Sequence, residues 1–213
     1  MRVNSFHPVS SDFKKKYTSE EKEFLDFVKS ECKKYGVKCD LRRTKYVKMT
    51  SSMRCSGWFD ESVPELVVAM NRQDWIEILV HEYSHLTQWV DKEPIWVKSE
   101  KSLSKVWDWL DGKNCKNIGS HLDVARELES NNDRRAVKII KKFNLDVDLD
   151  HYIQKSNAYH QFYNWLKVTR KWCKPTNSPY KNQRLVNSMP KTFIKDGSIL
   201  LPKYEKIFRE EKI

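Results

Sequence analysis

The stretch "LVHEYSHLTQW", residues 79–89, constrains this chain more than any other feature, because it holds two histidines four residues apart with a glutamate beside the first. It lies in an apolar segment, residues 75–90, whose hydrophobic residues recur with helical spacing. On a helix, His81 and His85 project together from the side nearly opposite the apolar stripe, about 40° apart around the axis. Glu82 can then reach a water on a shared metal ion, but not the ion.

This pattern predicts a zinc site. The alternative is a helix that carries two surface histidines. Two features favour the zinc site: the pair lies at the centre of an apolar helix, and a strand-like run, "ELVVAM", leads directly into that helix.

Two histidines do not complete a catalytic zinc site, which takes a third protein ligand and a water. Residues 121–143 predict another helix, and Glu129 falls within its apolar stripe, with Asp133 beside it and Glu127 on the opposite face. An acidic side chain in a core stripe is costly unless it is paired or bound to metal. Glu129 is therefore the favoured third ligand, and a salt bridge to a lysine is the alternative explanation. The other candidates are His121, which ranks next, and the more distant His151 and His160.

"HEYSH" followed by "ELESNNDRRAV" resembles the gluzincin metallopeptidases, the thermolysin-like group, in which a glutamate from an ExxxD segment completes an HExxH site. The resemblance implies that one Zn²⁺ per chain is bound by His81, His85 and Glu129. It also implies that Glu82 activates the water as a general base and that Asp133 orients a ligand histidine. The gap from His85 to Glu129 is longer than in thermolysin, and it contains a Trp-rich insertion.

The first half of the chain predicts a helix and a small sheet. Residues 18–36 have helical spacing, with Thr18 and Glu21 placed for a capping box. Three short apolar runs follow between residues 37 and 70 and predict a mixed sheet of about three strands. We expect "ELVVAM", residues 65–70, at the edge of this sheet, where an extended peptide could pair with it.

In the second half, Pro94 is expected to end the HExxH helix, which Asn71 or Asp74 can cap. Residues 95–110 favour a helix followed by a loop, and the glutamate-ligand helix is expected from about Ser120, with Asp123 in a capping box. Residues 151–173 predict a further, aromatic-rich helix. Beyond Pro175 we expect an irregular tail that wraps the domain.

Together these elements predict an α+β, zincin-like single domain over residues 1–213. Its core spans about 18–145, and the C-terminal helix and tail follow from about 150. The order of elements also looks like a minimal zincin of the kind encoded by bacteriophages and mobile elements. Hydrolysis needs a donor for the developing oxyanion. The aromatic helix offers five candidates: His151, Tyr152, Tyr159, His160 and Tyr163.

Composition adds expectations about partners and compartment. The net charge is +11, which favours an acidic polypeptide substrate, but the basic residues are scattered, so nucleic acid is possible and not favoured. The five cysteines are widely spaced, as is typical of free thiols in a reducing cytoplasm. The first 17 residues lack the apolar core of a secretory signal, and no run approaches the length of a membrane span. We expect a cytoplasmic protein, in the host cytoplasm if it is phage-encoded.

The favoured hypothesis is a zinc-dependent endopeptidase that cuts a polypeptide, with Glu82 as the general base. One alternative is a nucleic-acid-associated protease. Another is a non-catalytic regulator that keeps a zincin-like fold for binding. The presence of Glu82 favours an enzyme, because a pure binding module has no chemical use for the base.

Overall fold

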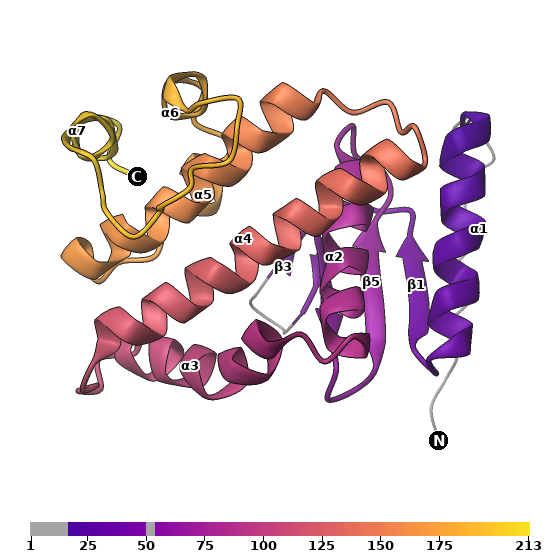
Figure 1. Ribbon diagram of the computed structural model, residues 1–213, viewed down its shortest axis with the longest axis horizontal. Coiled ribbons are helices and arrows are strands. Elements are labelled where there is room, and N and C mark those ends of the chain that lie inside the picture. Colours follow the sequence, from indigo (N-terminus) through magenta and orange to yellow (C-terminus); the bar gives the residue numbers. More distant parts are fainter. Residues whose placement is uncertain (1–16, 50–53) are drawn as a thin grey trace.

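The computed structural model describes residues 17–49 and 54–213, which form an α+β fold (Figure 1). The helices are α1 (Ser19–Lys34), α2 (Trp75–Val90), α3 (Pro94–Leu110), α4 (Ile118–Lys142), α5 (Leu149–Thr169), α6 (Gln183–Ser188) and α7 (Pro202–Glu210), with a 3-10 turn at Pro175–Asn177. The strands are β1 (Lys38–Arg42), β2 (Val47–Lys48), β3 (Arg54–Cys55), β4 (Gly57–Asp60) and β5 (Glu65–Ala69). None of the helices in this described part is long and apolar enough to cross a membrane. Residues 1–16, which include most of the segment expected to lack a secretory signal, lie outside it.

The three-stranded sheet has the order β1-β5-β4, with β1 parallel and β4 antiparallel to β5. The small mixed sheet is thus confirmed, but the expected position of "ELVVAM" at its edge is wrong. It forms β5, the central strand, and the side chains from Leu66 to Ala69 are fully buried. A run that is apolar at every position suits a strand covered on both faces, so it is a poor indicator of an edge. The two edges are β1 and β4.

Helix α1 begins as the sequence predicts. The Thr18 hydroxyl accepts a hydrogen bond from the backbone N–H of Glu21, and the Glu21 carboxylate accepts one from the N–H of Thr18. This capping box satisfies two amide groups that the first helical turn leaves unpaired. Phe24 and Val28 then face the core that α1 shares with the sheet and with α2.

The helices that follow α2 differ in detail from expectation. Pro94 lies in the first turn of α3, where its missing N–H costs nothing. Helix α4 begins at Ile118, not near Ser120, and its N-cap Asn117 has a left-handed backbone and makes no side-chain capping bond. Asp123 is therefore not part of a capping box. Its carboxylate accepts hydrogen bonds from Arg126 and Lys167 instead, because α5 brings a second cation to it.

The C-terminal segment is more regular than expected. The aromatic-rich helix spans α5 and ends at Thr169, so residues 171–173 lie beyond it. Two short helices, α6 and α7, form in the stretch that was expected to be irregular. Tyr204 and Phe208 are buried one turn apart on α7 and pack in a hydrophobic cluster with residues of α5 and α6. Helices this short contain too few turns to give a clear periodic signal.

Helix α4 connects two hydrophobic clusters. Ala136 and Ile140, in its C-terminal half, belong to the cluster around α1, the sheet and α2. Leu122 and Ala125, in its N-terminal half, belong to the cluster around α3, α5, α6 and α7. The acidic segment from Glu129 to Asp133 lies between them, so polar side chains concentrate where the two clusters meet.

Candidate metal centre

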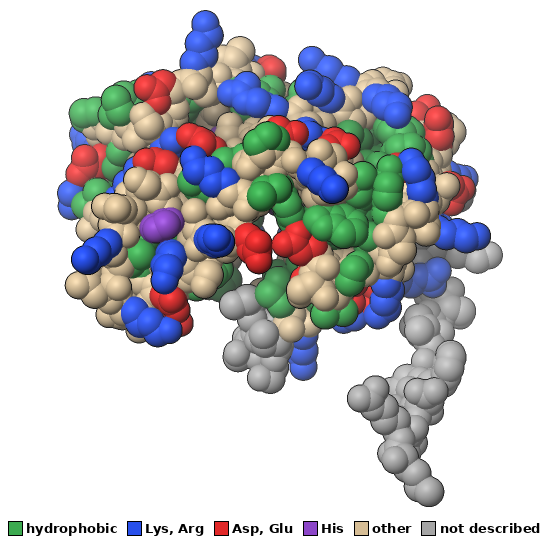
Figure 2. All heavy atoms as spheres, turned by 60° about the horizontal axis from the view of Figure 1, so that its bottom comes forward, with side chains coloured by type: hydrophobic (Ala, Val, Ile, Leu, Met, Phe, Trp, Pro, Cys, Tyr) green, Lys and Arg blue, Asp and Glu red, His purple; other side chains and the backbone are tan. Residues whose placement is uncertain are grey.

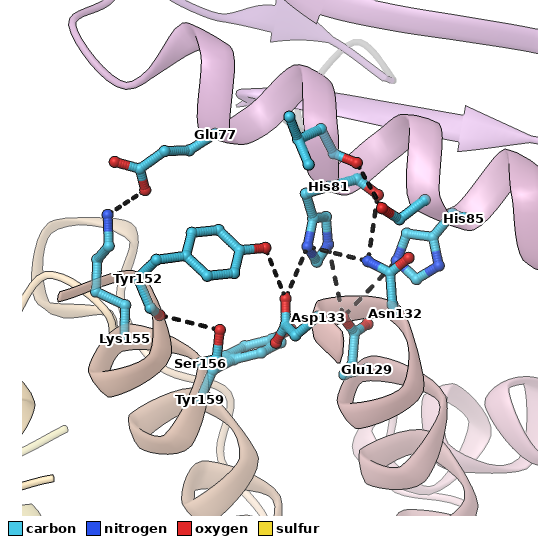
Figure 3. Close-up of polar contacts among 12 residues, drawn as sticks. Glu77, His81, His85, Glu129, Asn132, Asp133, Tyr152, Lys155, Ser156 and Tyr159 are labelled. Carbon is cyan, nitrogen blue, oxygen red and sulfur yellow. Dashed lines mark hydrogen bonds and ion pairs between the residues drawn. The ribbon is translucent and has the colours of Figure 1, made fainter. Parts of the chain in front are cut away.

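Three side chains from two helices converge at this junction (Figure 3). His81 and His85 project from α2, and Glu129 projects toward them from α4. The Oε2 atom of Glu129 lies 3.6 Å from Nε2 of His81 and 3.7 Å from Nε2 of His85. One possible ligand atom from each residue lies within 4.8 Å of the other two. These three residues can therefore hold a metal ion.

The Glu129 carboxylate fits such an ion for a second reason. Its Oε2 atom is buried and accepts no hydrogen bond from the described residues. A buried carboxylate oxygen without a partner is unfavourable, and a cation between it and the two rings would remove that cost. Burial alone would raise the pKa of Glu129, but the nearby rings of His85 and His81 lower it. The carboxylate is thus negatively charged, as a metal ligand must be.

Gln88 orients His85. Its Oε1 atom lies 2.8 Å from Nδ1 of His85. Its amide nitrogen donates to the carbonyl of Leu128 at 3.1 Å and to Oδ1 of Asn131 at 2.8 Å. Because both nitrogen contacts are to acceptors, the Gln88 oxygen faces the ring and accepts from Nδ1–H. Nε2 of His85 then carries a lone pair that faces Glu129 and is free to bind a metal.

Asp133 holds His81 in the same way. Its Oδ1 atom lies 3.3 Å from Nδ1 of His81 and accepts a hydrogen bond from the Tyr152 hydroxyl at 3.0 Å. Its Oδ2 atom lies 2.9 Å from Nε2 of His160. Burial would raise the pKa of Asp133, but the contacts with His160 and His81 hold it far below its usual range. A charged Asp133 therefore accepts from the Nδ1–H of His81 and leaves Nε2 facing Glu129.

The carboxylates around His81 raise the pKa of its ring. Burial alone would lower the pKa of this ring, but the hydrogen bond to Asp133 and the charges of Glu82 and Glu129 raise it to about 10. Asn132 donates from Nδ2 to the backbone carbonyl of His81 at 3.2 Å. The negative carboxylates around His81 thus stabilise a positive charge at this position, which either a proton or a metal ion can provide.

Glu82 lies between α2 and the edge strand β4. A Cβ atom on Gly57 of β4 would meet Cγ of Glu82 at 3.1 Å and the carbonyl of Val67 at 2.8 Å, so glycine allows this close approach. Burial raises the pKa of Glu82, the rings of His81 and His85 oppose that shift, and a backbone hydrogen bond from Phe59 lowers it further. The net pKa is raised, which moves the carboxylate toward the range useful for a general base.

The candidate oxyanion donors separate into two groups. Tyr152 and His160 hydrogen-bond Asp133, and the backbone N–H of His151 donates to the N-cap Asp148. Tyr159 and Tyr163 contact each other, with hydroxyl oxygens 3.4 Å apart. Burial raises the pKa of both of these hydroxyls, and the charge of Glu129 adds to the shift. Both therefore keep their protons, and Tyr159 is the less buried of the two.

The remaining candidate ligands lie elsewhere. Nδ1 of His121 lies 3.2 Å from the hydroxyl of Ser102 on α3, and the ring does not join the metal-binding group. Glu127 is exposed on the opposite side of α4, as the helical wheel predicts. The five cysteines are free and form no metal-binding group within the described part of the chain.

Sequence reasoning missed Gln88, Asn132 and the contacts that Tyr152 and His160 make with Asp133. One sequence feature could have indicated the role of Gln88. It follows His85 by three residues, so the two side chains share a helix face. The contacts between Asp133 and α5 left no such signal, because they depend on how α4 and α5 pack.

The fold and the site define an α+β protein whose α2 and α4 bring together three residues able to hold a metal ion. Comparison with known proteins finds no matching family model, no matching curated protein and no matching solved structure.

Proposed function

We propose that this protein is a zinc-dependent endopeptidase of the gluzincin type, with a zincin-like fold and a bacteriophage origin inferred from the sequence resemblance alone. The observation that carries the proposal is the buried Oε2 of Glu129, which lacks a hydrogen-bond partner in the described residues and lies 3.6 and 3.7 Å from two ring nitrogens. Two imidazole nitrogens and one carboxylate oxygen are the ligands of many catalytic zinc sites. Glu82, next to the first ligand, gives the site a general base.

Zinc, when bound, would lower the pKa of a water and polarise the carbonyl of the scissile bond. Glu82 would take up a proton from the attacking water. When the C–N bond breaks, Glu82 returns the proton to the leaving nitrogen. Asp133 and Gln88 keep the two rings oriented throughout, because each accepts from a Nδ1–H.

Tyr159 is the favoured oxyanion donor among the residues of α5. His160 and Tyr152 are engaged with Asp133, and Tyr163 is almost fully buried. Burial and the charge of Glu129 raise the pKa of the Tyr159 hydroxyl, so it keeps its proton, and the residue as a whole is less buried than Tyr163. A tyrosine in this position can stabilise negative charge on the carbonyl oxygen.

The substrate would be a polypeptide that lies extended along β4. This edge strand is short, its free side is not paired by another strand of the three-stranded sheet, and Glu82 lies against it. Backbone pairing at a sheet edge holds a peptide in extended form and leaves its carbonyl groups aligned. The support for this substrate class is the geometry of β4 and the position of the base beside it.

The test is the Glu82→Gln variant, with the exposed Glu127→Gln variant as a control. Both should bind one zinc per chain when metal content is measured by mass spectrometry. Glu82→Gln should lower kcat on an unfolded protein substrate by about 10²–10⁴-fold. Glu127→Gln should leave kcat unchanged. A Glu82→Gln protein with undiminished activity would overturn the enzyme proposal and favour the non-catalytic binding alternative.

A further inference from the structure

A second feature of the structure lies beside the proposed active site. A groove of about 440 Å³ opens between the C-terminal end of α2, the first turns of α3 and the residue that follows β4. Its lining includes Glu61, Trp89, Lys92, Trp96 and Glu100. Its volume is within the range of pockets that hold a small ligand, so it has room for a long side chain of a bound peptide.

An aromatic wall joins this groove to the metal-binding residues. The ring centroid of Trp96 lies 5.8 Å from that of His85 and 5.8 Å from that of Phe59 on β4. Phe59 in turn lies 5.7 Å from Trp89. Trp96 thus contacts a metal-binding histidine and also forms part of the groove. The groove begins one aromatic ring away from His85.

The charges of the groove are opposite to those of the whole protein. Glu61 and Glu100 contribute two carboxylates, and Lys92 is the single cation that lines it within the described chain. The Glu61 carboxylate accepts a hydrogen bond from Nε1 of Trp96, and neither acid forms an ion pair with a described residue. The protein carries a net charge of +11, and on the face drawn in Figure 2 the Lys and Arg side chains are dispersed over the surface. Two carboxylates without an ion-pair partner beside the half-buried indole rings of Trp89 and Trp96 are therefore a local exception.

We propose that this groove is a subsite for one basic side chain, arginine or lysine, of the polypeptide substrate. The inference rests on the proposed peptidase function and specifies its substrate. Tryptophan faces attract guanidinium and ammonium groups, and the aliphatic stem of either side chain packs well on indole. Glu61 and Glu100 provide the countercharge.

The path of the substrate supports this assignment. Strand β4 ends at Asp60, and Glu61 follows it directly. A peptide paired along β4 therefore passes the groove after it passes Glu82 and the metal-binding histidines. The basic residue occupies a position a short distance from the scissile bond, and the same position should be selected in every substrate.

The experiment uses the zinc-loaded full chain and a fluorogenic peptide library. Each position in turn is fixed as arginine, citrulline, lysine, leucine or glutamate. Citrulline has the shape of arginine without its charge. At one position, kcat/KM should be about tenfold higher for arginine than for citrulline, and lysine should also exceed leucine. Equal values for arginine and citrulline at every position would overturn the proposal.

The double variant Glu61→Gln/Glu100→Gln tests the residues. Glutamine at position 61 keeps an acceptor for Nε1 of Trp96, so the wall should stay in place. The ratio of kcat/KM for the arginine peptide to kcat/KM for the citrulline peptide should fall to about one in this variant. The same ratio should stay near tenfold in Glu127→Gln. If this ratio stays near tenfold in the double variant, the preference for arginine arises from other residues, and the assignment of the subsite to this groove is overturned.

A binding measurement separates this inference from the peptidase proposal. The zinc-loaded Glu82→Gln protein is titrated calorimetrically with the arginine peptide and with its citrulline counterpart. Tighter binding of the arginine peptide, lost in a Glu82→Gln protein that also carries the double change, supports the subsite. If no peptide is cleaved but this difference is seen, only the peptidase proposal fails. If peptides are cleaved without any such difference, only the subsite fails.

Discussion

Nδ1 of His85 lies 2.8 Å from Oε1 of Gln88, one helical turn further along α2. The amide nitrogen of Gln88 is held by two acceptors on α4, Leu128 and Asn131, so the orientation of the amide is fixed from outside its own helix. Helix α4 therefore sets the tautomer of His85 as well as supplying Glu129. One glutamine thus links the orientation of a candidate metal ligand to the packing of α2 on α4.

Replacing Gln88 with methionine should weaken zinc binding by about 10–100-fold, since loss of a partner that orients a ligand histidine has this effect. Methionine has a similar length and can fill the buried space. Zinc affinity is measured by competition with a chromophoric chelator. Gln154→Met is the matched control, because Gln154 also donates to a backbone carbonyl, that of Met189, but lies away from the site. Equal affinity in wild type and Gln88→Met would contradict the role of this contact.

Replacing Glu129 with alanine should remove the stabilisation that zinc gives. At a free zinc concentration 100 times the dissociation constant, a single site stabilises the folded state by about 2.7 kcal/mol. For a chain of this size that corresponds to a rise in Tm of about 5–10 °C. The rise should be seen by calorimetry in wild type and in the exposed control Glu127→Ala, and it should be absent in Glu129→Ala. A full zinc response in Glu129→Ala would exclude this residue as a ligand.

The stability of the metal-free protein should fall as the pH rises from about 7 toward 10. His81 titrates near 6.5 in an unfolded chain, and its pKa in the folded protein is raised to about 10. The folded state binds the proton more tightly, so the stabilisation is complete below the unfolded pKa and is lost as the pH passes through the folded one. Bound zinc would replace that proton, so the stability of the zinc-loaded protein would no longer depend on the titration of His81. The difference in Tm between zinc-loaded and chelator-treated protein should therefore widen with pH.

Two histidine variants check the source of this pH effect. His81→Gln should flatten the pH dependence of Tm in the metal-free protein, because the ring with the raised pKa is absent. His121→Gln should leave it unchanged, since that ring contacts Ser102 and not the carboxylates of the site. A metal-free wild type with constant Tm over this pH range would speak against the protonated state of His81.

Gly57→Ala should lower both stability and activity. The new Cβ would meet backbone and side-chain atoms at 2.8 to 3.1 Å, so β4 and Glu82 must move apart. Overpacking of this kind costs about 1–3 kcal/mol, and a displaced base lowers kcat. Gly119 in α4 offers the contrast, because a Cβ there meets nothing within 4 Å. Gly119→Ala, in the first turn of α4, should change stability by no more than about 0.5 kcal/mol and leave kcat unchanged.

Much of the fold was accessible from local patterns. The capping box of α1, the helix around His81 and His85, and the strand character of residues 65–69 depend on neighbours in sequence, and each was predicted. The order of the strands was not accessible, because β5 pairs with β1 and β4 through contacts that leave no periodic trace. Helices α6 and α7 were missed because their apolar residues become a buried face only when α5 lies beside them.

Sequence patterns alone were enough to indicate the two histidines and the carboxylate that could bind a metal ion. Helical periodicity placed two imidazoles on one face of a helix and put a carboxylate in an apolar stripe of another, and both patterns depend only on the geometry of a single helix. The tertiary structure alone decided that Glu129 meets both rings, that Asp133 and Gln88 fix their tautomers, and that β4 is the edge beside the base. These are contacts between separate elements. They depend on how the two hydrophobic clusters orient α4 across α2, a relationship that no repeat along the chain encodes.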